Sequence, residues 1–329
     1  MEREMESLID NKTWELIEPP TDQTLIDSKW VYKLKDNPAG DEAKIFKARL
    51  VVNDETFNLI ILVLCVDDMF IWAKNQSDVD ECKSKLKSAF KMNELRESKR
   101  ILGMEINRDH EQKRLWLSQG KPDIAFAMGK VSRYMSNPWK VHWEAVKWIM
   151  KHLKSILDYG LLFDGLLDNA KSLFGYVDVD CGQDLDKRRS TTGYVFTLGG
   201  GSISWRSTLQ KCVAQSITEA EYVAVAEASK EAIWLDRLII EMGLKQGVVN
   251  LHWDSQSVLH LAANQVVDSR VKHIDIKYHF IKQAVYDKTI ELVKINGKLN
   301  PADALTKVIP LESFRRHCAT MQVVHGEHM

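Results

Sequence analysis

SLFGYVDVD, at residues 172–180, is the stretch that decides the fold, because an apolar run of β-branched and aromatic residues leads into two carboxylates. Such a run predicts a strand over residues 172–179. Two more strand-like segments follow at residues 193–198 and 202–206, and three glycines at residues 199–201 join them. Three consecutive strands therefore open the predicted sheet.

Helices and strands then alternate along the chain. A helix is expected to start at Thr218, run through Ala232 and continue into a second helical stretch ending at Gly243. The remaining predicted elements are a strand at 248–253, a helix from Ser255, a helix at 272–286, a strand at 290–295 and a short helix opened by Pro301. Strands first and alternation later indicate an α/β fold, with a mixed five-stranded sheet and helices on its faces.

Four carboxylates recur at the edges of these elements. They are Asp178 in the first strand, Glu221 in SITEAEYVAVAEA, Asp254 in VNLHWDSQSV and Asp303 in LNPADALTK. Acids brought together from distant parts of a sheet suit hard divalent cations such as Mg²⁺ or Mn²⁺, which take oxygen ligands. Two such ions can clamp the attacking and leaving oxygens of a phosphodiester, so the pattern indicates a metal-dependent nuclease.

Three of these acids also have a purely structural interpretation. Glu221 lies three residues after Thr218, which is the spacing of a capping box. Asp254 directly precedes a predicted helix and can cap it. Asp303 can complement the dipole in the first turn of the last short helix. The four positions taken together, within one strand and helix order, favour the metal site.

In two places a second acid stands beside the chosen one. In VDVD, Asp178 is the expected ligand because the strand reaches it first, and Asp180 is the alternative, expected at the surface. In TEAEY, Glu221 is expected rather than Glu219, which lies one residue into the helix and is expected to be solvated.

The first half of the chain predicts hairpins, helices and one connector. Hairpins are expected at residues 29–52 and 100–117, helices at 77–90, 122–135 and 143–157, and a loop-rich connector at 158–169. The apolar run at residues 59–66 predicts a buried strand that turns at Asp67 and Asp68 into a second strand. We place a domain boundary near residue 170.

Composition sets the protein class. The chain has 329 residues, of which 45% are hydrophobic and 28% charged, which is typical of a globular protein of about two domains. Its formal net charge is −1, so nucleic-acid binding would depend on local patches. Five scattered cysteines without CxxC spacing argue against zinc and disulfides. We expect an intracellular protein, cytoplasmic or nuclear, without a signal peptide or transmembrane segment.

Two basic clusters are candidates for phosphate contacts. The first consists of Lys187, Arg188 and Arg189, between the first two strands of the predicted sheet. The second includes Arg270, Lys272 and Lys277, at the start of the helix expected over residues 272–286. Basic side chains that contact phosphates position a protein on nucleic acid. A solvated helix face explains the second cluster equally well.

The C-terminal half resembles the ribonuclease H domain of copia-type LTR retrotransposon Pol polyproteins. The stretches that carry the resemblance are GYVDVDCGQDLDKRRSTTGYVFTLGG, SITEAEYVAVAEASKEAIWL, LHWDSQSVLHLAAN, RVKHIDIKYHFIK and NPADALTK. It implies magnesium-dependent cleavage of the RNA strand of an RNA–DNA hybrid. It also implies that Asp178 and Asp254 bridge two metal ions and that Glu221 and Asp303 complete the sites.

The first half resembles fragments of the reverse transcriptase of the same polyprotein. NKTWELIEPP, KWVYKLK with FKARLVV, and LVLCVDDMFIWAKN carry the resemblance, and the last holds the paired aspartates of a polymerase hairpin, Asp67 and Asp68. KARLVVNDETFN leads almost directly into that hairpin, whereas the family has a long intervening stretch with the first catalytic aspartate. Nucleotide transfer needs that carboxylate, so we expect polymerase activity to be lost.

The sequence thus predicts an incomplete α+β reverse transcriptase remnant (palm and fingers) at residues 1–120. A helical connection at 121–170, a ribonuclease H-like domain at 171–324 and a tail at 325–329 follow. The predicted function is metal-dependent hydrolysis of the RNA strand of RNA–DNA hybrids, with no membrane partner. The alternatives are a non-catalytic retroelement remnant and a nucleic-acid-binding module that keeps the fold without turnover.

Overall fold

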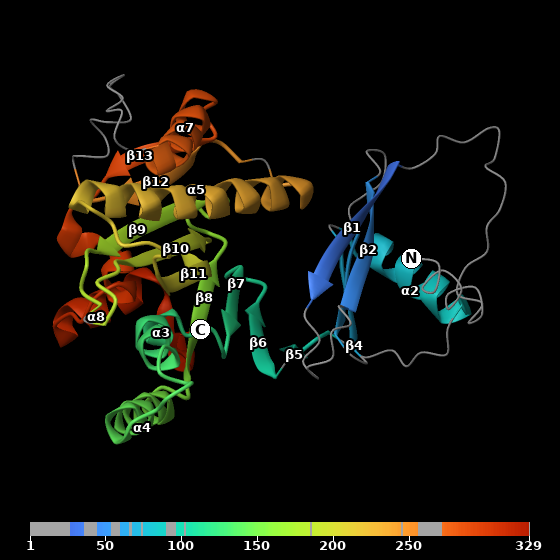
Figure 1. Cartoon of the computed structure of the whole chain (residues 1–329). Helices are drawn as coiled ribbons and strands as arrows, with labels where there is room; N and C mark the ends of the chain where they lie inside the picture. Colours follow the sequence, from blue (N-terminus) through green and yellow to red (C-terminus); the bar gives the residue numbers. More distant parts are fainter. Residues whose placement is uncertain are drawn as a thin grey trace. The chain divides into compact units, whose positions relative to one another are not determined.

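The computed structural model describes residues 27–35, 45–53, 60–65, 68–73, 75–89, 97–101, 103–184, 186–244, 246–255 and 272–328 (Figure 1). The chain forms two compact units. One comprises Met1–Val63 and Ile71–Phe90, and the other comprises Leu64–Phe70 and Lys91–Met329. In the part of the chain so described, no helix has both the length and the apolar composition that crossing a bilayer requires.

The N-terminal strands form two small two-stranded sheets. β1 (Asp27–Lys35) pairs antiparallel with β2 (Ile45–Asn53), and β3 (Ile60–Cys65) pairs with β4 (Asp68–Ala73), which α2 (Gln76–Ala89) follows. The hairpin expected at residues 29–52 is confirmed, and so is the pair of strands expected on either side of Asp67 and Asp68. The prediction that the apolar run is buried is wrong, because Leu62 in β3 is 51% exposed. Among the described strands β3 has β4 alone as its neighbour, and two strands cannot bury both faces.

The larger unit is built on a mixed five-stranded sheet. Its strands are β9 (Phe174–Asp180), β10 (Thr191–Leu198), β11 (Gly201–Leu209), β12 (Val249–Trp253) and β13 (Ile290–Lys294). They lie in the order β11-β10-β9-β12-β13. β10 is antiparallel to both its neighbours, while β12 is parallel to β9 and to β13. The predicted α/β class with a mixed five-stranded sheet is confirmed.

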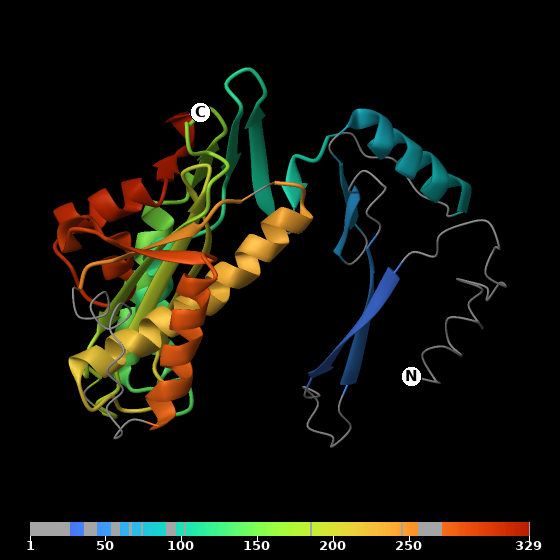
Figure 2. The ribbon, with the colours of Figure 1, turned by 90° about the horizontal axis from the view of Figure 1, so that it is seen from above.

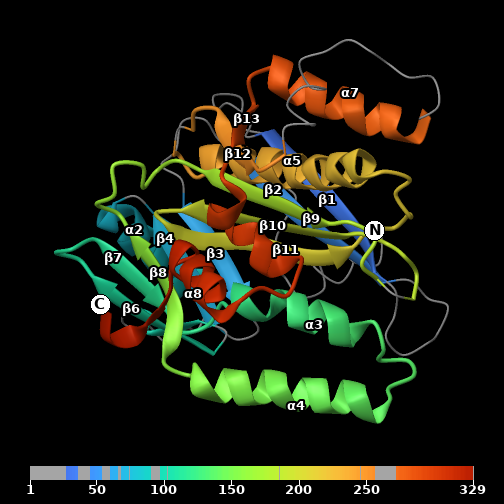
Figure 3. The same ribbon diagram turned by 90° about the vertical axis from the view of Figure 1, so that its left-hand side faces the viewer.

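Two helices cover one face of this sheet. Figures 2 and 3 show α5 (Ile217–Glu241) lying across the strands with α7 (Lys272–Tyr286) beside it. Val177, Phe196 and Leu251 of the strands pack with Val225 of α5 and Ile281 of α7, and all five are essentially inaccessible. Each such side chain contributes about 1.5–3 kcal/mol by leaving water. This core fixes β9 at the centre of the sheet.

The helix α5 is one continuous helix and not the two helical stretches that were expected. Neither glycine nor proline occurs between residues 217 and 241, so nothing in the sequence interrupts it. Ala220, Ala224, Ala228 and Ala232 recur every four residues and are all fully buried. Small side chains along one stripe allow the helix to approach the sheet closely.

A second sheet lies against the opposite face. Its strands are β5 (Arg100–Ile101), β6 (Met104–Asp109), β7 (Arg114–Leu117), β8 (Tyr159–Asp164) and β14 (Val323–His325), in the order β14-β8-β7-β6-β5. Leu161 and Val323, paired in this sheet, share a core with Val195, Leu305 and Met321. Val195 follows Tyr194 along β10 and faces the other way, as strand alternation requires.

The prediction of a loop-rich connector at residues 158–169 is therefore wrong, since β8 occupies much of it. Gly160 lets this strand lie close to β7, because a Cβ at this position would lie 2.2 Å from the carbonyl oxygen of Leu117. The short segment YGLLFD shows too little alternation of apolar and polar residues to predict a strand, although β8 is paired on both sides.

Helices complete the second face. The helices expected at residues 122–135 and 143–157 are confirmed with shifted ends, as η1 (Pro122–Ile124), α3 (Ala125–Ser132) and α4 (Lys140–Ser155). Near the C-terminal end of the chain α8 (Leu311–Thr320) joins them on this face (Figure 3). His152 of α4 contacts the buried Asp123 carboxylate at 2.7 Å and so anchors α4 to η1. The outer side of α4 stays open to solvent, with Trp143 65% exposed.

The boundary near residue 170 stays a prediction, and the position of β8 offers a test. We expect a fragment of residues 171–329 to melt roughly 10 °C below a fragment of residues 91–329, because it loses the partner strand of β14 and several buried side chains. Thermal unfolding of both fragments by circular dichroism measures this difference. Equal melting temperatures would support a boundary near residue 170.

Candidate active site

Asp178 stands where the two central parallel strands separate. The pairing of β9 with β12 ends at Tyr176 and His252. Continuing that register by two residues brings Asp178 level with Asp254, which directly follows β12. Ligands of α/β proteins bind beyond the carboxyl ends of such strands. Asp178 as a whole residue is only 3% exposed, so its carboxylate is held inside the fold.

Asn300 fills the gap between the separated strands. It is fully buried, and its Nδ2 donates a 2.8 Å hydrogen bond to the carbonyl oxygen of Val177, the residue before Asp178. Its Oδ1 accepts from the backbone N–H of Ala302 at 3.2 Å, which caps η3 (Pro301–Leu305). One side chain thus attaches η3, which carries Asp303, to the strand that carries Asp178.

Glycine at position 193 allows η3 to lie this close to the sheet. Gly193 of β10 pairs with Asp178 in the strand register. A Cβ at Gly193 would lie 2.7 Å from Thr306 Cγ2 and 2.8 Å from Leu305 Cβ, closer than real Cβ atoms come to their neighbours. Any larger residue here would push Asp303 away from Asp178.

The structure brings three of the four predicted acids together. Asp178, Asp254 and Asp303 each offer a carboxylate oxygen, and these oxygens lie within 4.8 Å of one another. They come from β9, from the end of β12 and from η3. A set of carboxylate oxygens at this spacing suits a hard divalent cation such as Mg²⁺ or Mn²⁺.

Glu221 lies outside that group of three. It is buried in the first turns of α5, 7% exposed, but among the described residues its carboxylate does not share the 4.8 Å cluster. The capping box expected for Thr218 and Glu221 is not the cap of α5. Ser216 is the N-cap, and its Oγ accepts from the N–H of Glu219 at 3.1 Å.

Two secondary expectations about neighbouring acids are wrong. Glu219 is buried and not solvated, and its Oε2 accepts a 2.6 Å hydrogen bond from the N–H of Gln215, which precedes the N-cap of α5. Asp180 is likewise buried and not at the surface. The position of these carboxylates in the sequence does not reveal their burial in the fold.

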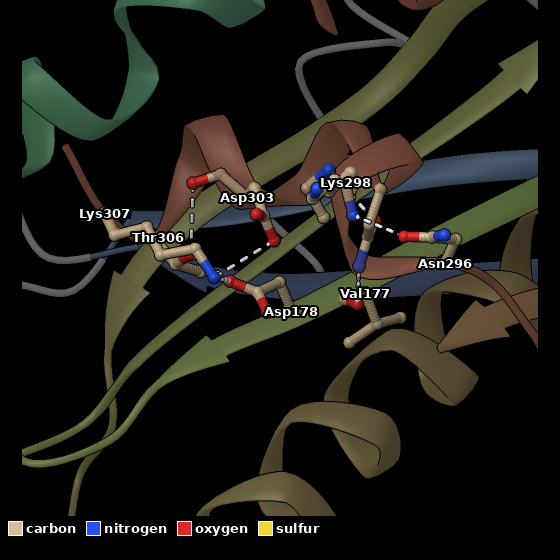
Figure 4. A network of polar contacts seen from close by, with 9 residues as sticks. Val177, Asp178, Asn296, Lys298, Asp303, Thr306 and Lys307 are labelled. Atoms are coloured by element: carbon tan, nitrogen blue, oxygen red, sulfur yellow. Dashed lines mark hydrogen bonds and ion pairs between the residues drawn. The ribbon is translucent and has the colours of Figure 1, made fainter. Parts of the chain in front are cut away.

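A hydroxyl and an ammonium hold the acids in place. Thr306 donates its hydroxyl hydrogen to Asp178 Oδ2 (Figure 4). Lys307 Nζ lies 3.4 Å from Asp178 Oδ2 and 3.1 Å from Asp303 Oδ1. The sequence interpretation missed Asn300, Thr306 and Lys307. The i, i+4 spacing of Asp303 and Lys307 and the Asn-Pro start of η3 were the available signals.

The electrostatics of the cluster reflect burial. The pKa of the Asp178 carboxyl is raised to about 7, chiefly by burial; Asp303 and Asp254 add to the rise, and Lys307 and Thr306 oppose it. Burial also raises the pKa of Asp303, again opposed by Lys307. Burial acts to lower the pKa of Lys307, but the two carboxylates outweigh it and the pKa is raised. The acids therefore need positive charge nearby to stay ionised.

The structure describes only some of the remaining predicted residues. Lys187 and Arg188 are exposed, and together with Arg189 they lie in a β9–β10 loop built around Asp184, whose carboxylate accepts from the Lys187 N–H at 3.0 Å. Arg270 lies outside the described residues. Lys272 and Lys277 lie on α7, but their side chains are not described. Asp67 lies outside the described residues, and Asp68 is the first residue of β4.

Comparisons with known proteins give consistent matches. Residues 52–121 match the family described as "Reverse transcriptase (RNA-dependent DNA polymerase)". The Pol polyprotein from transposon TNT 1-94 of Nicotiana tabacum is 39% identical over 78% of this chain and 24% of its own length. The Pol polyprotein from transposon RE2 of Arabidopsis thaliana is 35% identical over 64% of this chain and 14% of its own length.

Among solved structures, LC11-RNase H1, isolated from compost, is 18% identical over 41% of this chain and 93% of that chain, with a TM-score of 0.33. The fold assignment of the larger unit rests on its own strand order. The chain spans about a quarter or less of the length of the transposon relatives named above. Their identity over most of this chain, with the reverse transcriptase match in its first half, shows that the chain belongs to the copia-type retrotransposon Pol polyproteins.

Proposed function

We propose that the larger unit hydrolyses the RNA strand of RNA–DNA hybrids in a reaction that depends on a divalent metal. The observation that carries the proposal is the meeting of Asp178, Asp254 and Asp303 within 4.8 Å at the carboxyl ends of parallel strands. The match to Pol polyproteins supports a nucleic-acid substrate. The polymerase half is not proposed to act, because Asp67 and Asp68 supply one hairpin only.

The donor set fits the metal that the proposal requires. The three ligand oxygens are hard, and Asp178 is buried beside two other acids, so a cation stabilises its ionised form. Mg²⁺ or Mn²⁺, when bound, supplies an activated water and stabilises the charge that develops on the phosphate. Asp178 and Asp254 would hold the metal from both central strands together with Asp303, and Glu221, outside their group, would contribute to a second ion.

The other residues of the site act through these acids. Thr306 fixes the orientation of the Asp178 carboxylate by hydrogen bonding. Asn300 and Gly193 set the distance between η3 and β9. The exposed loop with Lys187, Arg188 and Arg189 offers positive charge for the phosphates of the hybrid, and Arg270, Lys272 and Lys277 are proposed to do the same.

One observation favours a second candidate function. Since Glu221 lies outside the group of three acids, the unit could bind hybrids without turning them over, as a nucleic-acid-binding module. Cleavage separates the two functions. A pure binding module would retain hybrids with and without Mg²⁺ and release no RNA fragments.

We expect Asp254→Asn to lower hybrid cleavage by about 100-fold or more, because the metal loses a charged ligand. The fold should persist, and the metal-free melting temperature should stay level or rise, since one of three mutually repelling charges is removed. Labelled RNA in a hybrid duplex, incubated with Mg²⁺, measures cleavage. Asp168→Asn, which removes an exposed carboxylate, is the matched control. Wild-type cleavage by Asp254→Asn would refute the site.

Stability without metal should depend on pH through Asp178. Its pKa is raised on folding, so its contribution to stability is full below its unfolded pKa and is lost as the pH rises through about 7. The difference in melting temperature between wild type and Asp178→Asn should therefore favour wild type more at about pH 5 than at about pH 8. Mg²⁺ should restore wild type alone at the higher pH. A difference that is constant with pH would contradict this assignment.

A further inference from the structure

Lys307 places a positive charge inside the acidic cluster. Its ammonium lies 3.1 Å from Asp303 Oδ1 and 3.4 Å from Asp178 Oδ2, so it joins acids that belong to η3 and to β9 (Figure 4). The lysine side chain is 37% exposed, whereas the Asp178 side chain is 5% exposed. The ammonium thus closes the cluster on its solvent side.

The ammonium and a divalent metal would compete for the same two carboxylates, those of Asp178 and Asp303. Asp178 Oδ2 already accepts from Thr306 and contacts Lys307. Mg²⁺ binds oxygen at about 2.0–2.1 Å and brings its ligands close around itself. Both cations cannot occupy the space between Asp178 and Asp303 at once. Either the metal is excluded or the ammonium moves.

The lysine side chain can move while its backbone stays fixed. The N–H of Lys307 donates to the carbonyl oxygen of Asp303 at 3.2 Å, which holds the backbone at the end of η3. The charge is carried on a flexible four-carbon stem that reaches solvent. A swing of this stem releases both carboxylates without any change in the fold.

We propose that Lys307 is a displaceable counter-ion of the metal site. In the metal-free protein it offsets the repulsion among Asp178, Asp254 and Asp303 and keeps them together. On metal binding it leaves the two carboxylates and moves to the rim of the site. The proposal rests on the proposed function, since it assumes that these three acids bind a divalent metal. A lysine with a merely structural ion pair would instead affect stability alone.

The test measures metal affinity and stability separately in the full chain. Mn²⁺ is the probe, its affinity is taken from isothermal titration calorimetry, and melting is followed with and without Mn²⁺. We expect Lys307→Met to melt below wild type without metal and to bind Mn²⁺ about tenfold more tightly, because a competing unit charge within a few ångströms is gone. Lys298→Met, which removes an exposed lysine charge from neighbouring η2 (Gly297–Leu299), should match wild type in both.

Two results would overturn the inference while leaving the metal site intact. One is unchanged or weaker Mn²⁺ binding by Lys307→Met when wild type binds; the other is an equal loss of melting temperature with and without metal. If Lys307→Met does not fold, Lys307→Arg decides, since it keeps the charge and should bind Mn²⁺ no more tightly than wild type. Tighter binding by that variant would also refute the idea. Absence of Mn²⁺ binding by wild type itself would instead remove the proposed function.

Discussion

The buried hydrogen bond from Asn300 to the carbonyl oxygen of Val177 is the contact on which the site depends. Two parallel strands that separate leave backbone groups without partners at the point of separation, and each unpaired buried group costs about 1–3 kcal/mol. Asn300 satisfies this carbonyl at 2.8 Å and at the same time starts η3. The opening that a metal site needs and the element that supplies Asp303 are therefore created by one side chain.

The site concentrates negative charge where the rest of the fold is apolar. Asp178 lies between Val177 and Val179, which both pack in the main core, so strand alternation turns its carboxylate to the opposite face, toward Thr306. Burial and mutual repulsion both disfavour the ionised carboxylates. Functional sites commonly hold such residues, which lower the stability of the fold locally, and other contacts offset the loss of stability. Here the hydrogen bond from Thr306, the positive charge of Lys307 and the extensive apolar core of the sheet offset this loss.

The sequence was sufficient for features that depend on local pattern. Strands over residues 172–179 and 248–253 and the order of strands and helices along the chain followed from apolar runs and turns, and three of the four predicted acids lie together. It was insufficient where a long-range contact decides the outcome. β8 forms because β7 and β14 flank it, and neither of these strands is adjacent to β8 in the sequence.

The same limit explains the residues that were overlooked. Asn300 gains its role from Val177, 123 positions away, and Gly193 from the close approach of Leu305 and Thr306. A local pattern can mark an asparagine before a proline as a helix start. It cannot show that the asparagine amide replaces a missing strand.

The pairing of β8 with β14 has a consequence for the order in which the chain folds. Leu161 pairs with Val323, so the sheet edge at β8 stays open during synthesis until the ribosome has delivered residues about 160 positions later. Contacts of such high sequence separation form slowly, and an unpaired strand edge invites pairing with other chains in the meantime. The rate of completing this edge, rather than the strength of the core, then limits how much newly made chain escapes aggregation.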